Sequence, residues 1–133
     1  MDIVINQTSN EPIYTQIFSQ ISSQIISGKL KPGEKLPAIR QISNQLRISV
    51  IPVKMAWEEL DRQGFIKTVT GSGTFVNSLK ETEIKEKLDE KTLLLAEKTC
   101  KEARQNGISK EKLIASIETI WNRQNHSRKY FFC

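Results

Sequence analysis

The chain is poor in the side chains that build metal centres and catalytic sites. Its 133 residues include two cysteines, Cys100 and Cys133, and one histidine, His126. Two cysteines so far apart indicate neither a disulfide framework nor a zinc site, so we expect free thiols. His126 lies in a polar segment without a neighbouring carboxylate or cysteine cluster, which argues against a ligand or catalytic role. No nucleophile–base pair or phosphate-binding loop is recognisable either, and we expect no enzyme, metal or cofactor.

Long apolar runs are also missing. No stretch of about 18 apolar residues exists, which argues against a membrane span. The first six residues lack the basic and apolar regions of a signal peptide, so we expect a cytoplasmic protein without membrane contact. Hydrophobic residues make up 38% of the chain, enough for a modest core, and this favours a partner subunit that completes the burial. The net charge of +5 favours a polyanionic partner.

The N-terminal part of the chain predicts a short arm and one long helix. The first ten residues start with the alternating apolar residues Ile3 and Ile5, as in a short arm or strand. Pro12 then marks the first turn of a helix. Isoleucine recurs every fourth residue in this helix, giving one apolar stripe, and Gly28 ends it; the stripe comprises Ile13, Ile17, Ile21 and Ile25.

Two shorter helices and a hairpin follow. Pro37 opens the second helix, and a break at residues 47–49 separates it from a third helix that ends at Gly64. Residues 65–69 and 74–76 form two expected strands around the tip Thr70-Gly71-Ser72-Gly73. The order helix-turn-helix then hairpin predicts a winged helix. The apolar positions of the two helices are Ile39, Ile42, Leu46, Val53, Ala56, Trp57 and Leu60.

The beginning of the third helix is the candidate DNA-binding surface. Ser49 is placed to cap this helix, and its first-turn N–H groups are suited to a phosphate. Cations lie on both sides of the turn, and the hairpin tip offers hydroxyls and a backbone that can approach closely. The candidate DNA-binding residues are Arg40, Arg47, Ser49, Val50, Ile51, Pro52, Lys54, Thr70, Gly71 and Ser72.

Each of these features also has a structural alternative. Lys54 and Arg47 can be ordinary solvated charges, and Gly71 with Gly73 can simply make a tight hairpin. Arg40 can form a structural ion pair with Glu34, Glu58 or Glu59. The acidic third helix, together with the apolar segment 50–52, leaves a protein-interaction module as the alternative function.

Five motifs occur in the order and spacing of a known family: PIYTQI from Pro12, GKLKPG from Gly28, LPAIR from Leu36, EL at Glu59 with GFI from Gly64, and GSGTFV from Gly71. Residues 11–78 therefore resemble the N-terminal domain of GntR-family bacterial transcription regulators. The resemblance implies a dimer and DNA contacts from the candidate residues above. The chain departs from the family pattern at Ala38, Val50 and Pro52, where polar residues are usual. These departures favour methyl contacts to thymine from Val50 or Ile51, or the reading of DNA shape.

Beyond a polar connection at residues 78–83, the pattern predicts two more helices. The first runs from Thr82 or Glu83 to about Asn106, and Ser109 caps the second. We therefore expect domains at residues 1–78 and 79–133. Two such helices resemble the short YtrA-type subfamily, in which they form the dimer interface. The candidate dimerisation residues are Leu88, Leu95, Ile114, Ile117 and Trp121; the alternative is packing against the first helix of the same chain. No period is clear in residues 122–133.

The sequence therefore predicts a mainly α fold with a small β-wing, in which a winged helix-turn-helix precedes a two-helix dimerisation region. The expected function is that of a dimeric, sequence-specific transcription regulator that binds double-stranded DNA at an inverted-repeat operator. By resemblance it represses its own or a neighbouring operon, one that often encodes a transporter. A small-molecule effector remains open, because no residue pattern specifies one.

Overall fold

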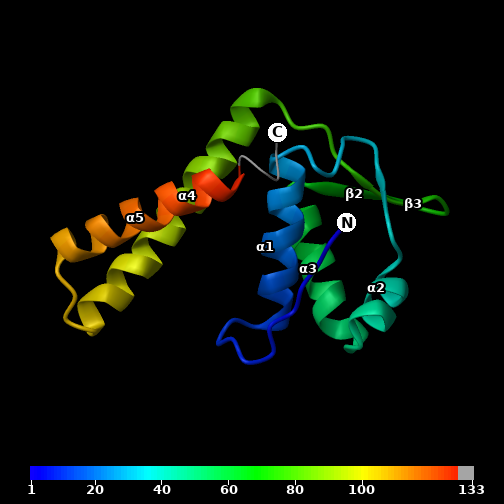
Figure 1. The fold of residues 1–133 in the computed structure, drawn as a ribbon. Helices are drawn as coiled ribbons and strands as arrows, with labels where there is room; N and C mark the ends of the chain where they lie inside the picture. The colour runs from blue at the N-terminus through cyan, green and yellow to red at the C-terminus, as the bar shows by residue number, and fades with distance from the viewer. Residues whose placement is uncertain (129–133) are drawn as a thin grey trace. The chain divides into compact units, whose positions relative to one another are not determined.

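The computed structural model describes residues 1–128, so Cys133 lies outside the described residues, as does the side chain of His126. Five helices and three short strands follow one another along the chain (Figure 1). They are α1 (Ile13–Ile26), β1 (Lys35–Leu36), α2 (Ile39–Leu46), α3 (Val50–Arg62), β2 (Ile66–Val69), β3 (Gly73–Val76), α4 (Glu81–Gln105) and α5 (Lys110–Arg128). None of the helices in this part of the chain is long and apolar enough to cross a membrane.

Packing divides the chain into two compact units, Met1–Leu88 and Asp89 onward. The division falls inside α4 because the beginning of that helix contacts the first unit. Lys87 Nζ donates a hydrogen bond to the backbone oxygen of Gln63 at 2.8 Å and lies 4.2 Å from the ring centroid of Phe65. The expected domain boundary at residues 78 and 79 concerns function rather than packing and stays a prediction.

The core of the first unit lies among α1, α3 and one face of the sheet. The predicted stripe of α1 is buried at Ile17, Ile21 and Ile25, and Ser27-Gly28 ends the helix, with Gly28 at φ 81°. Helix α3 contributes its predicted apolar side. The fully buried large side chains of this core include Ile17, Ile21, Leu30, Val53, Leu60, Phe65, Ile66 and Val76.

Strand β1 is the element that sequence patterning missed. Lys35 pairs with Phe75 and Leu36 with Thr74, so the antiparallel sheet has the order β1-β3-β2. The amide of Gly33 also donates to the backbone oxygen of Val76 at 2.8 Å. Two residues are too few for an alternation pattern, and pairing with a distant strand is what defines β1. Its effect is to attach the loop after α1 to the wing.

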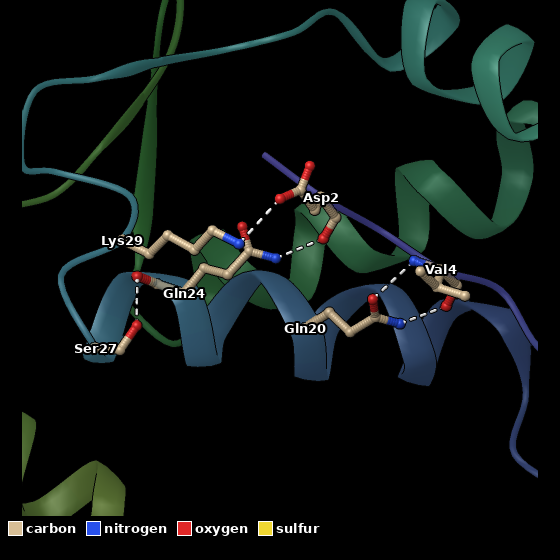
Figure 2. Close-up of polar contacts among 6 residues, drawn as sticks. All are labelled: Asp2, Val4, Gln20, Gln24, Ser27 and Lys29. Atoms are coloured by element: carbon tan, nitrogen blue, oxygen red, sulfur yellow. Dashed lines mark hydrogen bonds and ion pairs between the residues drawn. The ribbon is translucent and has the colours of Figure 1, made fainter. Parts of the chain in front are cut away.

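The N-terminal arm is held by side chains of α1 rather than by a strand (Figure 2). Gln20 accepts a hydrogen bond from the amide of Val4 at 2.8 Å and donates to its carbonyl at 2.7 Å. Gln16 makes the same pair of bonds with Asn6, at 2.8 and 3.0 Å. Gln24 donates to the carbonyl of Asp2 at 2.6 Å, while its buried Oε1 has no partner.

The geometry of the two segments explains this regular pairing. Four residues of helix rise about 6 Å, and two residues of an extended chain cover about 6.6 Å. Glutamines spaced by four therefore match alternate residues of the arm. Ile3 and Ile5, the residues between the paired ones, pack against the core. The predicted arm is therefore present, and its backbone is paired with glutamine side chains.

In the second unit, α4 turns into α5 through Gly107, which has φ 70°. The predicted cap is present, because Ser109 Oγ accepts a hydrogen bond from the amide of Lys112 at 3.1 Å. Only Ala103 is buried among the described hydrophobic residues of this unit. Helix α5 continues to Arg128, past Asn122 where the apolar period fades.

Candidate nucleic-acid interface

The turn between α2 and α3 is made by Arg47 in a left-handed conformation. Its φ is 57° and its ψ 47°, a region that glycine usually occupies. The amide of Ile48 donates to the carbonyl of Ser43 at 3.0 Å, and that of Arg47 to Asn44 at 3.3 Å. These two bonds close the end of α2 within three residues of the start of α3. The predicted tight turn is therefore present, at the expense of strain at a non-glycine residue.

The N-terminus of α3 is left uncompensated by side chains. Ser49 occupies the capping position, as predicted, but its side chain makes no capping hydrogen bond. The first turn also contains no acidic residue, so the partial positive charge of the helix end faces solvent. Val50 and Ile51 are exposed and Pro52 is half-buried. The hydroxyl of Ser49 and the N–H groups of this helix end can together donate hydrogen bonds to a phosphate oxygen.

The three candidate cations lie on α2, in the turn and on α3. Arg40, Arg47 and Lys54 are all exposed, and within the described part of the chain none of them forms an ion pair. Glu59, one of the alternatives for Arg40, is instead engaged by Arg62. The alternative of a structural ion pair is therefore not realised for Arg40, which is available to an anionic partner.

The Glu59 carboxylate is held by two neighbours on its own helix. Arg62 Nε donates to Oε2 at 2.9 Å, a second guanidinium nitrogen of Arg62 contacts Oε1, and Gln63 Nε2 donates to Oε1 at 2.7 Å. These hydrogen bonds, first that of Arg62 and then that of Gln63, lower the pKa of Glu59 to about 2. The negative charge of Glu59 is thereby compensated by Arg62 on the same helix.

The wing is a tight hairpin whose tip is exposed. Val69 pairs with Gly73, and the amide of Ser72 donates to the carbonyl of Val69 at 2.9 Å across Thr70 and Gly71. Gly71, at φ 81°, meets open space, whereas a Cβ on Gly73 would lie 2.7 Å from Lys35 Cε. Gly73, at φ 123°, has the backbone conformation that requires glycine and lies beside the Lys35 side chain, and Thr70, Gly71 and Ser72 are the exposed tip residues.

Sequence patterning missed two lysines on the wing. Lys35 of β1 and Lys67 of β2 both pair with Phe75 of β3. Directly paired residues of an antiparallel sheet share a face, and Leu36, Ile66 and Val76 occupy the buried face. The outer face therefore carries Lys35 and Lys67 on either side of Phe75. The alternation around Ile66 could have indicated Lys67, but Lys35 depends on the unrecognised strand.

The candidate dimerisation residues are exposed without exception. The exposed fractions are 46% for Leu88, 67% for Leu95, 44% for Ile114, 46% for Ile117 and 60% for Trp121. Leu93 and Leu94, which lie off the predicted stripe, are also more than 60% exposed. Exposed large apolar side chains gathered along two helices are typical of an interface.

Two comparisons decide the family. A model of bacterial regulatory proteins, gntR family, matches residues 13–76. The uncharacterized HTH-type transcriptional regulator YhcF of Bacillus subtilis is 33% identical over 114 residues, which cover 84% of this chain and 92% of YhcF. The chain belongs to the GntR family. It is therefore a transcription regulator, and not an enzyme.

Other GntR proteins support the same assignment. The HTH-type transcriptional repressor YtrA of B. subtilis is 36% identical over 84 residues, covering 63% of this chain and 65% of YtrA. A GntR family transcriptional regulator from Listeria monocytogenes has a similar structure, with a TM-score of 0.68, 28% identity and coverage of 86% of this chain and 98% of that one. The DNA-binding domain of AraR in complex with operator ORX1 gives a TM-score of 0.50 at 30% identity, covering 57% and 95%.

The comparisons confirm the predicted winged-helix fold and family. The matched region ends at residue 76, the last residue of the wing, and includes α3 and the candidate residues around it. The roles of individual residues stay predictions, because no nucleic acid is bound to this GntR chain.

Proposed function

We propose that this GntR chain is a homodimeric repressor that binds double-stranded DNA at an inverted-repeat operator. The observation that carries the proposal is the uncompensated N-terminus of α3, together with exposed cations on α2, in the turn and on α3. Arg40, Arg47 and Lys54 are exposed and without ion pairs in the described part of the chain. A recognition helix in this position enters the major groove, with its N-terminal residues against the bases and cations against phosphates.

The wing would make the second contact. Thr70, Gly71 and Ser72 form its exposed tip, and Lys35 with Lys67 adds positive charge on its outer face. A hydroxyl, a backbone amide or a lysine can each donate to a phosphate oxygen or to the edge of the minor groove. We assign residues 1–78 to DNA binding on this basis.

Residues 79–133 would form the dimer. Their exposed apolar stripe comprises Leu88, Leu95, Ile114, Ile117 and Trp121, and a second copy of the hairpin would cover it with two-fold symmetry. Two recognition helices at a fixed spacing then require an inverted repeat. Repression and a transporter operon are carried over from the resemblance to YtrA, a cytoplasmic location from the expected role, and no effector is assigned.

Selection from random duplexes, followed by band shifts, tests the proposal. The parent should select an inverted repeat and bind it at least a hundredfold more tightly than a scrambled duplex at moderate salt. Arg40→Ala with Lys54→Ala should weaken binding and lower the slope of log K against log salt by about four, because two phosphate contacts are lost in each of the two protomers.

The matched control is Lys101→Ala with Lys112→Ala. It removes the same charge from exposed positions of α4 and α5 and should leave the slope close to that of the parent. Equal affinity for the selected and scrambled duplexes would contradict sequence-specific binding. A parent that retains no DNA at all would favour the alternative of a protein-interaction module.

A further inference from the structure

The first two turns of α3 have an exposed apolar edge, which we define as Val50, Ile51 and Met55. Their exposed fractions are 43%, 65% and 42%. The buried side of α3 is formed by Val53, Ala56, Trp57 and Leu60, so Ile51 and Met55, four residues apart, lie on the opposite side. Ile51 is mostly exposed, and Val50 and Met55 each leave about two fifths of their surface in water, so folding of the chain leaves an apolar edge uncovered at the end that faces the proposed groove.

The chemistry of this edge restricts what it can recognise. None of the three side chains donates a conventional hydrogen bond, so a bidentate contact to guanine or adenine from these positions is excluded. The base edges of the major groove are polar except for one group, the C5-methyl of thymine. An apolar side chain that covers a polar base edge leaves that edge without its hydrogen bonds, which is unfavourable.

The surroundings of the edge favour DNA over an apolar protein surface as its occupant. Arg47 in the adjoining turn, Lys54 on α3 and Arg40 on α2 are exposed without ion pairs among the described residues. The first turn of α3 has no acidic residue, and the Ser49 hydroxyl is not used in a cap. Apolar side chains bordered by unpaired cations and a positive helix end match a groove whose walls are phosphates and whose floor presents methyl groups.

We propose that Val50 and Ile51 determine the specificity of this regulator by contacting thymine C5-methyl groups in each operator half-site. This inference rests on the proposed function and adds the base identity that the helix reads. Each half-site then contains thymine at one or two fixed positions opposite the beginning of α3, and Met55 lies deeper along the same edge. Arg40, Lys54 and Ser49 hold the helix on the backbone without reading sequence.

Replacing single thymines by uracil in the selected duplex tests the inference, because uracil pairs identically with adenine and lacks only the methyl group. One uracil at a contacted position should weaken binding by the parent about fourfold, the value expected for losing one buried methyl. In Ile51→Ser or Val50→Ser the same duplex should bind equally well with thymine or uracil at the position that the replaced side chain covers. Thermal unfolding checks that each variant keeps its fold.

Val69→Ser is the matched control. Val69 has the same side chain as Val50 and a similar exposed fraction of 41%, but it lies on the wing. This variant should keep the fourfold uracil effect of the parent. If uracil has no effect at any position while the parent still prefers the selected duplex, the inference is wrong and the proposed function stands. If no duplex is preferred, the proposed function itself is contradicted.

Discussion

The two units of the chain use similar apolar content in opposite ways. In the unit that ends at Leu88, the residues of the predicted stripes are buried around Leu60 and Phe65. In the unit from Asp89 onward, Ala103 is the one buried hydrophobic residue among those described, and leucines and isoleucines along both helices are exposed. The first unit thus carries its own core, whereas the second presents an apolar surface.

The difference shows that apolar periodicity predicts the apolar side of a helix, but not whether the same chain covers that side. Each large aliphatic side chain gains about 1.5–3 kcal/mol when it is fully buried. The first unit realises this gain within one chain, because three helices and a sheet surround the same side chains. A two-helix hairpin has too few elements to do so, and we expect it to realise the gain in the dimer.

The largest predicted effect concerns the exposed stripe. Leu95→Asp should weaken dimerisation at least a thousandfold, on the order of 4 kcal/mol, because two unpaired carboxylates would be placed in an apolar interface. Sedimentation equilibrium should then find monomers at micromolar concentration. Leu93→Asp is the matched control, since Leu93 is similarly exposed but lies about 200° round the helix. A Leu95→Asp variant that stays dimeric would place the interface elsewhere.

The next effect concerns the core of the first unit. Leu60→Ala should lower the free energy of unfolding by about 3–4 kcal/mol, because Leu60 is fully buried and a cavity would remain. Each unit contains one tryptophan, so urea unfolding of a Trp121→Phe background reports on Trp57 alone. Leu94→Ala, at a position 65% exposed, should change this transition by less than about 0.5 kcal/mol. Equal effects would mean that the units do not differ as described.

A smaller effect is expected at the turn. Arg47→Gly should raise the stability of the first unit by about 1 kcal/mol, because it relieves the left-handed conformation. The same change should weaken DNA binding, since it removes a cation. Arg47→Lys keeps both the charge and the strain and should resemble the parent in both measurements. A glycine variant that is less stable than the parent would show that Arg47 makes a stabilising contact.

The smallest effect is a pH dependence that also belongs to the first unit. The folded-state pKa of Glu59, about 2, lies below its ordinary value of 4.5. Its contribution to stability is therefore present above pH 4.5 and is lost as the pH falls toward 2. The difference in unfolding free energy between the parent and Glu59→Gln, measured in urea, should shrink over this range. Arg62→Ala should remove most of this pH-dependent part, because the Arg62 hydrogen bond is the larger cause of the lowered pKa and that of Gln63 the smaller. A difference between parent and Glu59→Gln that stays constant with pH would contradict the prediction.

The fold followed from the sequence where structure is local. Residues of α1 to α3 form helices close to the expected bounds, because their apolar spacing, Pro12 and Gly28 act within a few residues. Strand β1 and the glutamine pairing of the arm could not be predicted, because both depend on partners far along the chain. For the same reason, Lys35 could not be assigned to the candidate site from the sequence.

The sequence predicted which residues make up most of the candidate site, but not their backbone conformation or hydrogen bonds. The exposure of Arg40 and Lys54 follows from their positions off the apolar stripes of α2 and α3, and that of the wing tip from its place in the hairpin turn. The left-handed Arg47 and the uncapped Ser49 do not, because backbone conformation and hydroxyl orientation leave no trace in the pattern of side chains. Both features, the left-handed Arg47 that ends α2 and Ser49 without a capping hydrogen bond, lie in the same turn, where DNA would bind.

The pairing of the arm with Gln16, Gln20 and Gln24 has a consequence for how this N-terminus can vary. An inserted residue between Val4 and Asn6 would leave one glutamine facing a backbone segment turned the wrong way, and would move either Ile3 or Ile5 into water. Two inserted residues would restore both the pairing of the backbone with the glutamines and the packing of the isoleucines against the core. The arm can therefore change in length only in steps of two residues between Asp2 and Asn6.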